Sequence, residues 1–195
     1  MPNTLDNAIS ILEDLVSFES ISGQPTHGIV SYIQDYLSDY DITASLSIDK
    51  DGQRANVFAT IGPEIDGGVL LNAHTDVVPV TGQNWNTDPF TLTHKENRLY
   101  GRGSVDMKGF LACVLASVPY FKTVKMKEPI HIAFSYDEET GGFGMPVLLE
   151  SIARMPFKPH IVIIGEPTEM QIITGHKGSY LSLIHISEPT RLGFI

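Results

Sequence analysis

The alternation of apolar helices and apolar strands after residue 106 is the feature that most restricts the fold. A helical stretch closed by Pro119 is followed by a strand, a second helix and a buried strand; the segments are "MKGFLACVLASVPYF" (107–121), "PIHIAFSY" (129–136), "MPVLLESIARM" (145–155) and "PHIVIIG" (159–165). When both kinds of element are apolar, helices usually cover both faces of a largely parallel sheet. The sequence therefore predicts an α/β sandwich.

The earlier part of the chain adds elements of both kinds. Hydrophobic periodicity predicts helices over about 5–16 and 26–40 and strands over 42–48, 55–61 and 67–78. Thr4 is a candidate cap for the first helix. The polar, turn-rich stretch 84–102, which holds the only tryptophan, Trp85, is predicted to be a long loop.

Composition restricts the partners and the compartment. A formal net charge of −10 favours metal cations or small molecules over nucleic acid and anionic membranes, which repel an acidic protein. The start "MPNTLDNAIS" lacks the basic flank and apolar run of a signal peptide, and no stretch approaches the ~20 apolar residues of a membrane span. We therefore expect a cytoplasmic protein. The only cysteine, Cys113, is predicted to be a buried thiol in "LACVLASV".

Acidic and imidazole side chains follow three of the predicted strands. "HTD" (74–76) follows the first, "DEE" (137–139) the second and "GEPT" (165–168) the third, while Asp106 lies where a loop enters a helix. Ligands of α/β sheets bind beyond the carboxyl ends of the strands. We therefore expect one shared site that contains His74, Asp106, Glu138, Glu139 and Glu166.

Such a cluster of like charges requires a cation. Two carboxylates about 4 Å apart repel each other by about 4 kcal/mol at an effective dielectric constant near 20. Imidazole and carboxylate ligands suit zinc, with cobalt or manganese as substitutes. Because residues two apart on an extended chain point to the same side, Asp76 can lie beside His74 and orient its ring. Of the two glutamates, one can coordinate metal while the other takes a proton from water.

Other polar residues are predicted to lie outside the site. Asp137 is expected to be a solvated carboxylate at a strand end, and Lys108 is either a partner of a site carboxylate or a solvated helix residue. His176 and Lys177 either contact substrate or begin a linker. The histidines expected to be on the surface or internally satisfied are His27, His94, His131 and His160.

Four segments together resemble one enzyme family. "HTDVVP", "YGRGSVDMKG", "DEETGG" and "GEPT" are similar, in order and spacing, to the zinc-dependent amidohydrolases and exopeptidases that include acetylornithine deacetylase, succinyl-diaminopimelate desuccinylase, aminoacylase and carboxypeptidase G. Within this family, "WNTDPFTLT", "VDMKGF" and "IIGEPTEMQIITGHKG" look most like acetylornithine deacetylase. The resemblance implies a three-layer α/β/α catalytic domain with a central, largely parallel mixed sheet.

The resemblance also implies a role for each site residue. His74 and Glu166 would bind a first zinc ion, Glu139 a second, and Asp106 would bridge the two. Glu138 would be the general base, and Asp76 would orient the ring of His74 without touching the metal. The peptide bond between Asp106 and Met107 would be a candidate for the cis form.

The implied reaction is hydrolysis of the acetyl amide of N2-acetyl-L-ornithine to L-ornithine and acetate, a step of arginine biosynthesis. The substrate would be a small N-acyl amino acid, and Glu138 would take a proton from water and return it to the departing amine. The full-length protein would be a homodimer that associates through a lid domain.

The length of the chain departs from this family, whose members are about twice as long. We expect residues 1–180 to be the N-terminal part of the catalytic domain, without the lid and dimerisation domain or the last histidine of the second metal. Residues 181–195 are expected to be an unmatched tail that departs from the family's pattern and is truncated or non-native, and His185 is not expected to be a ligand. Little or no activity is expected from this fragment.

Two alternatives stay open at this level. The first is a dipeptidase, aminoacylase or desuccinylase on the same scaffold. The second, of a different class, is a non-catalytic metal-binding fragment.

Overall fold

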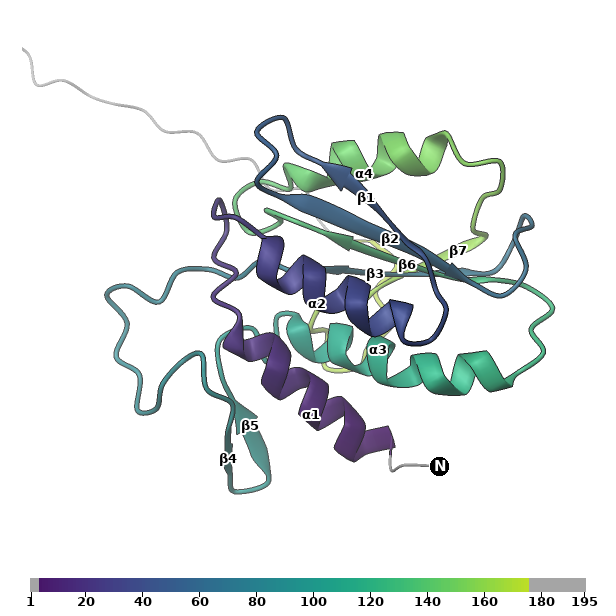
Figure 1. Cartoon of the computed structure of the whole chain (residues 1–195). Coiled ribbons are helices and arrows are strands. Elements are labelled where there is room, and N and C mark those ends of the chain that lie inside the picture. The colour runs from purple at the N-terminus through teal and green to yellow at the C-terminus, as the bar shows by residue number, and fades with distance from the viewer. Residues whose placement is uncertain (1–3, 176–195) are drawn as a thin grey trace, which may run out of the picture.

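The protein is built around one mixed five-stranded sheet (Figure 1). The computed structural model describes residues 4–175. In the order β1-β2-β6-β3-β7, the strands are Ala44–Ile48, Ala55–Ile61, Ile130–Ser135, Val69–His74 and Ile161–Ile164. The pairs β1/β2 and β2/β6 are antiparallel, whereas β6/β3 and β3/β7 are parallel. The expected mixed sheet is confirmed, and its parallel half carries the strand ends where acidic residues were predicted.

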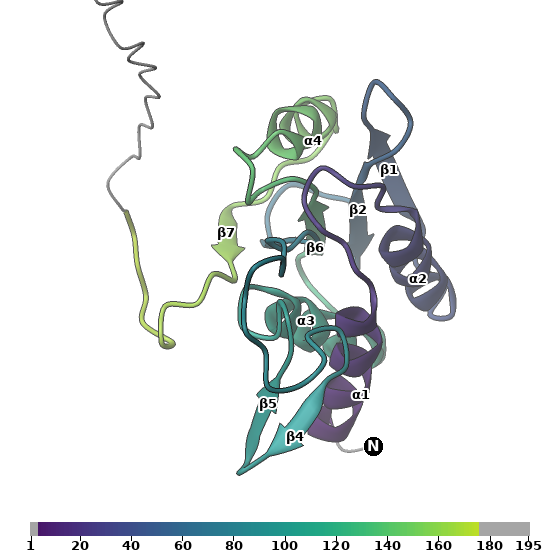
Figure 2. The same cartoon turned by 90° about the vertical axis from the view of Figure 1, so that its left-hand side faces the viewer.

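Helices cover both faces of this sheet. One face is covered by α1 (Thr4–Ser17), α2 (His27–Ser38) and α3 (Lys108–Thr123), and the other by α4 (Gly144–Ala153) (Figures 1 and 2). The core divides in the same way: a large cluster lies under the three helices, and a small one joins α4 to the sheet through Phe58, Leu70 and Leu148. The predicted three-layer α/β/α arrangement is confirmed.

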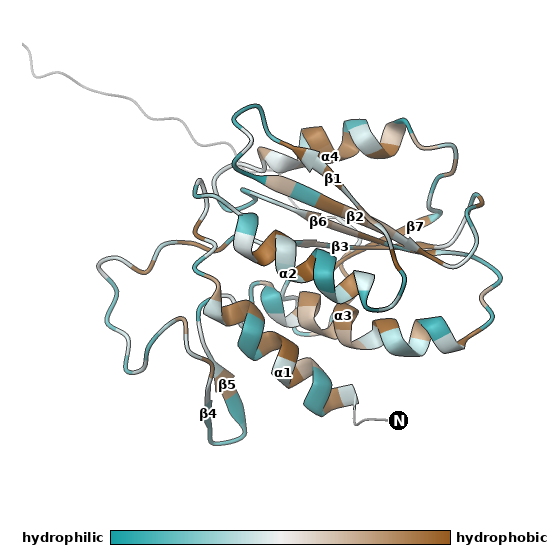
Figure 3. Cartoon of the chain, in the orientation of Figure 1, coloured by the Kyte–Doolittle hydropathy of each residue, from teal (hydrophilic) through white to brown (hydrophobic). Residues whose placement is uncertain are grey.

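The first helix forms because its apolar residues share one face. Leu12, Leu15 and Val16 are buried, whereas Leu5, in the first turn, is exposed. Figure 3 shows hydrophobic and hydrophilic residues side by side on α1 and α2, as expected for helices that bury one face. Fully burying one such side chain contributes about 1.5–3 kcal/mol.

The stretch 84–102 is not entirely a loop. It contains a hairpin of β4 (Thr93–Lys95) and β5 (Arg98–Tyr100). The two turn residues, Glu96 and Asn97, have φ angles of +52° and +58°. Hairpin turns of this kind favour glycine or asparagine, and a glutamate at the first position hides the usual signal.

The third helix does not end at Pro119 but continues to Thr123. Proline lacks an N–H, so the carbonyl of Leu115, four residues earlier, loses its helical donor. The hydroxyl of Tyr36 on α2 donates to that carbonyl at 3.1 Å. A tertiary hydrogen bond thus replaces the missing helical one, and the sequence pattern alone does not reveal it.

Two expectations about burial are wrong. Cys113 is exposed, because it lies on the outer side of α3 between the buried Ala112 and Val114. Strand β7 forms as predicted, but all four of its residues are exposed, since within the described residues β7 lies at the edge of the sheet and pairs only with β3. Hydrophobicity predicted this strand correctly but gave no information on its place in the sheet.

Within residues 4–175, no helix has the length and hydrophobicity that a membrane span requires.

The start of β3 depends on the absence of a side chain at residue 68. Gly68 has φ +74°, and a Cβ there would lie 1.9 Å from the carbonyl oxygen of Pro129. We predict that Gly68→Ala lowers the free energy of unfolding by about 2–4 kcal/mol, from left-handed strain plus overpacking. Gly82, at φ +78°, is the matched control, because a Cβ added there would have no other atom within 4 Å. Gly82→Ala adds only the strain, about 1–2 kcal/mol. Urea unfolding of both variants measures the difference, and equal losses would contradict the proposed clash.

Candidate metal centre

The predicted site residues gather at one edge of the sheet. His74 is the last residue of β3, Glu138 and Glu139 follow β6, and Glu166 follows β7. Because β6, β3 and β7 run parallel, their carboxyl ends meet at this edge. Asp106 reaches the same place from the loop before α3, and its carboxylate lies 3.0 Å from the ring of His74.

The imidazole of His74 is held in one orientation. Its side chain is buried, and its Nδ1 lies 2.9 Å from the carbonyl oxygen of Asp76. A carbonyl only accepts hydrogen bonds, so Nδ1 must carry the proton. In the neutral ring, Nε2 then turns a lone pair toward Oδ1 of Asp106 at 3.0 Å and Oε1 of Glu166 at 4.0 Å. A positive species, either a proton or a metal ion, must occupy the space between these acceptors.

The donor set fits a divalent metal. One ligand atom from each of His74, Asp106 and Glu139 can be chosen so that all three lie within 4.8 Å of one another. Two ligands of a tetrahedral zinc ion lie about 3.4 Å apart, given bonds of about 2.1 Å. The contacts of His74 with Asp106 and Glu166 bracket that separation. One imidazole with carboxylates also suits zinc, cobalt or manganese chemically.

The electrostatics around the cluster lead to the same conclusion. Burial lowers the pKa of His74, but the carboxylates of Asp76, Glu166 and Asp106 outweigh it, so that the pKa is raised. Burial raises the pKa of both Glu139 and Glu166, and the charge of Asp106 raises both further, while His74 opposes the shift. The contribution of the neighbouring carboxylates to each shift comes from negative charge that a bound cation would neutralise.

Asp76 holds two parts of the site at once. Its carboxylate accepts the backbone N–H groups of Glu138 at 3.0 Å and Glu139 at 3.3 Å, and the hydroxyl of Ser22 at 2.6 Å. The same carboxylate lies 3.6 Å from Nδ1 of His74, so the ring is held mainly by the carbonyl of Asp76. Asp76 therefore lies beside His74 as expected, but its side chain chiefly anchors the backbone of the two glutamates.

The loop that carries Asp106 is joined to His74 by its neighbour. The Asp106–Met107 peptide bond is cis, as the family resemblance implied. Met107 is buried, and its sulfur accepts the backbone N–H of His74 at 3.3 Å. This contact brings the entrance of α3 against the end of β3.

Two expectations about charged neighbours are corrected. Asp137 is not solvated: its side chain is 1% exposed and forms an ion pair with Arg54 at 2.5 Å. Lys108 is neither solvated nor hydrogen-bonded to a site carboxylate. It is fully buried, and its Nζ donates to the carbonyl of Phe18 at 2.7 Å. Burial lowers the pKa of Lys108 to about 7, with the charge of Asp76 acting in the opposite direction. Neither burial could be predicted, because both residues are strongly polar.

The remaining histidines lie outside the cluster, as expected. His27, His94 and His160 are exposed. His131 is buried, contacts the hydroxyl of Thr60 through Nδ1 at 3.0 Å and stacks against aromatic rings on both sides. Burial lowers its pKa. The expectations for His176, Lys177, His185 and the segment 181–195 lie outside the described residues.

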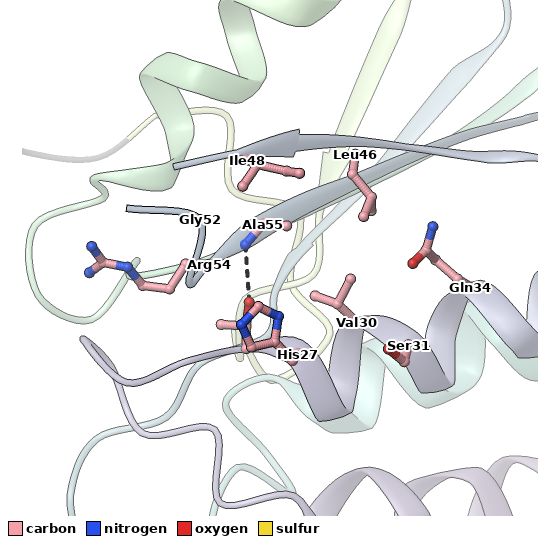
Figure 4. Close-up of a pocket in the computed structure, with 10 residues that line it drawn as sticks. His27, Val30, Ser31, Gln34, Leu46, Ile48, Gly52, Arg54 and Ala55 are labelled. Carbon is pink, nitrogen blue, oxygen red and sulfur yellow. Dashed lines mark hydrogen bonds between the residues drawn. The ribbon is translucent and has the colours of Figure 1, made fainter. Parts of the chain in front are cut away.

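A separate cavity of about 100 Å³ lies between α2 and the strands β1 and β2 (Figure 4). Residues such as His27, Val30, Leu46 and Arg54 line it, and none of the cluster residues does. The guanidinium of Arg54 is already engaged by carboxylates, so it is not free to bind a ligand there. The candidate metal centre at the strand ends is therefore separate from this cavity.

Comparison with known proteins now identifies the family. The family model described as peptidase family M20/M25/M40 matches residues 70–192, which is more than half of the chain. The chain belongs to this family. Acetylornithine deacetylases of Salmonella paratyphi B and Salmonella newport are 34% identical to it over 98% of its length. That alignment covers 52% of each relative, so the chain spans about half the length of the curated relatives it matches.

Solved structures of the family agree with the fold. Human carnosine dipeptidase 1 matches with a TM-score of 0.67 and 25% identity, covering 82% of this chain and 38% of that one. An M20 family metallo-carboxypeptidase from Sulfolobus solfataricus matches with a TM-score of 0.68 and 22% identity, covering 82% and 37%. The chain is thus a member of the M20 family that is similar to acetylornithine deacetylases, and the family is one of metallopeptidases that use divalent metals.

The raised pKa of His74 predicts a pH effect in the metal-free protein. Because the folded-state pKa lies above 6.5, the charged ring stabilises the fold fully below pH 6.5, and this contribution is lost as the pH rises through the folded-state value. We therefore compare the free energies of unfolding of wild type and His74→Asn in the presence of a chelator. The amount by which wild type exceeds the variant should be larger at about pH 5.5 than at about pH 8.5. Denaturant unfolding at both pH values measures this. A difference that is constant with pH would show that the carboxylates do not act on the ring.

Proposed function

We propose that the protein hydrolyses the acetyl amide of N2-acetyl-L-ornithine to L-ornithine and acetate, with a divalent metal bound at the candidate centre. The observation that carries the proposal is the His74 ring, which is fixed so that Nε2 faces the carboxylates of Asp106 and Glu166. The 34% identity to acetylornithine deacetylases supports this choice of substrate. Zinc is the proposed metal, with cobalt or manganese as substitutes, and arginine biosynthesis in the cytoplasm is the proposed setting.

The proposed ligand roles follow the geometry. His74 and Glu166 would hold a first metal ion, Glu139 a second, and Asp106 would bridge the two positions. The 4.0 Å between His74 and Glu166 supports the first position, and Glu139 lies within reach of Asp106, since ligand atoms of His74, Asp106 and Glu139 all lie within 4.8 Å of one another. The division of His74 and Glu139 between two ions follows the family resemblance. Among residues 4–175, the second position then has only Asp106 and Glu139. We therefore propose that the 195 residues alone bind one ion better than two and turn over little substrate.

Glu138 is the proposed general base. Its side chain is exposed, whereas its backbone N–H is fixed by Asp76 at 3.0 Å, so the carboxylate projects from a held position. A bound divalent metal would polarise the acetyl carbonyl and lower the pKa of a nearby water. Glu138 takes the proton from the attacking water and then delivers it to the departing amine nitrogen of ornithine. Asp76 supports the separate roles of Glu138 and Glu139 by holding both of their amides.

A dipeptidase is the second candidate, because human carnosine dipeptidase 1 shares 25% identity and the same fold with this chain. Aminoacylase and desuccinylase activities of the same family, and a metal-binding fragment without catalysis, are further outcomes of the tests below. Homodimerisation through a lid domain stays a prediction from the sequence.

Substrate preference tests the first part of the proposal. We expect the longest protein that the gene encodes, loaded with zinc, to show a higher kcat/KM for N2-acetyl-L-ornithine than for N-succinyl-diaminopimelate or a dipeptide such as carnosine. Chromatographic separation of the product from the substrate gives the rate for each. A preference for either of the other substrates would replace the deacetylase proposal with the corresponding activity.

Glu138→Gln separates catalysis from metal binding. We expect it to lower kcat by about 10²–10⁴-fold, because the base is lost, while the zinc content stays that of wild type. Glu139→Gln is the comparison, since it should lose zinc as well as turnover. Atomic absorption after dialysis gives the metal content. If Glu138→Gln loses zinc to the same extent as Glu139→Gln, then Glu138 is a ligand and not the base.

A further inference from the structure

The segment that carries Glu138 and Glu139 has an unusual backbone. It leaves β6 at Tyr136 and enters α4 at Gly144. Asp137, directly before the two glutamates, has φ +55°, a left-handed conformation that few non-glycine residues adopt. A segment with this backbone is defined only where outside contacts hold it.

The side chain of Asp137 supplies two such contacts. Its Oδ1 accepts the backbone N–H of Gly23 at 2.7 Å, and its Oδ2 forms the 2.5 Å ion pair with Nη1 of Arg54. Gly23 belongs to the same loop as Ser22, whose hydroxyl is bound by Asp76. The loop of Ser22 and Gly23 therefore donates hydrogen bonds to two carboxylates, that of Asp76 and that of Asp137.

Arg54 is itself held in place. Its Nε donates to Asp49 at 2.7 Å, and its guanidinium lies over the ring of Tyr136, 5.6 Å from the ring centroid. The next residue, Ala55, starts β2 and donates its N–H to the hydroxyl of Thr26 at 3.0 Å. Figure 4 shows Arg54 at one end of the cavity, beside Gly52 and away from Gln34. The cation is thus a fixed part of the scaffold.

A neighbour on β2 ties both ends of the same segment. The buried Asn56 accepts the N–H of Tyr136 at 3.1 Å and donates to the carbonyl of Gly144 at 3.0 Å. These bonds fix where the segment begins and ends, while Asp76 holds the amides of Glu138 and Glu139 in its middle. The pair formed by Arg54 and Asp137 acts on that middle, one residue before Glu138.

We propose that Arg54 is a positioning residue of the metal centre: through Asp137 it sets the backbone that presents Glu138 and Glu139. The roles of these two glutamates rest on the proposed function. Arg54 itself contacts neither of them. It directly precedes β2, the strand that pairs with β6, and it reaches the segment through Asp137. Its loss removes the ion pair that helps to hold Asp137 in its left-handed conformation, so that only the hydrogen bonds with Asp76 hold the amides of Glu138 and Glu139 and the carboxylate of Glu139 shifts relative to the other ligands.

The test compares Arg54→Gln with two related variants and a matched control in the 195-residue chain. Arg54→Lys keeps the charge but not the two-carboxylate contact, and Asp137→Asn removes the partner while tolerating the left-handed backbone. Arg154→Gln removes the same charge and another ion pair, with Glu150 on the exposed face of α4. Zinc affinity is measured by competition with a chromophoric chelator, and amide exchange of Glu138 and Glu139 by NMR.

We expect Arg54→Gln to weaken zinc binding about tenfold and to speed exchange of both amides. Asp137→Asn should have a similar effect, the double variant should be little worse than either single one, and Arg54→Lys should be intermediate. Arg154→Gln should match wild type. A lower melting temperature with unchanged zinc affinity and unchanged exchange would overturn the proposal, since it would make Arg54 a support of the fold only.

The outcome also separates this proposal from the proposed function. If wild type binds no zinc, the proposed metal chemistry fails, and amide exchange alone then decides the role of Arg54. Faster exchange at Glu138 and Glu139 in Arg54→Gln would still support positioning, whereas unchanged exchange would refute it.

Discussion

Repulsion among the carboxylates at the ends of β3, β6 and β7 is the constraint on which the rest of the site depends. The parallel strands bring these groups together, and burial strengthens the repulsion by removing water. The surrounding contacts therefore hold backbone rather than charge: Asp76 binds two amides, and Asn56 binds both ends of the β6–α4 segment. Backbone hydrogen bonds, together with the ion pair of Arg54 and Asp137 beside the two glutamates, hold the site in place, and a bound cation would balance the charges of the ligands themselves.

The sequence predicted the elements that carry the site, because periodicity and strand-end motifs are local signals. It located β3, β6 and β7 and brought His74, Asp106 and Glu166 to one edge. It did not predict the hairpin at Glu96, because the turn lacks the expected residues. Burial was the weakest point, since exposure of β7 depends on strand order, which periodicity does not encode.

The supporting residues were missed for a related reason. Arg54 and Asn56 lie some 80 residues before the segment they hold, in a stretch without any catalytic motif. Asp137 and Lys108 are of types that are almost never fully buried, so composition argued for solvation. Only the tertiary contacts show that Asp137 forms an ion pair with Arg54 and that Nζ of Lys108 donates a hydrogen bond to a backbone carbonyl.

The hydrogen bond from the hydroxyl of Tyr36 to the carbonyl of Leu115 makes the formation of α3 depend on α2. An isolated peptide of α3 would carry an unsatisfied acceptor beside Pro119 and would form a helix poorly. The last turn of α3 is therefore a product of its docking against α2 and not of its own propensity. The last turn of α3 and the contact between α2 and α3 should therefore form in one cooperative step, so that the length of this helix depends on a neighbour and not only on its own residues.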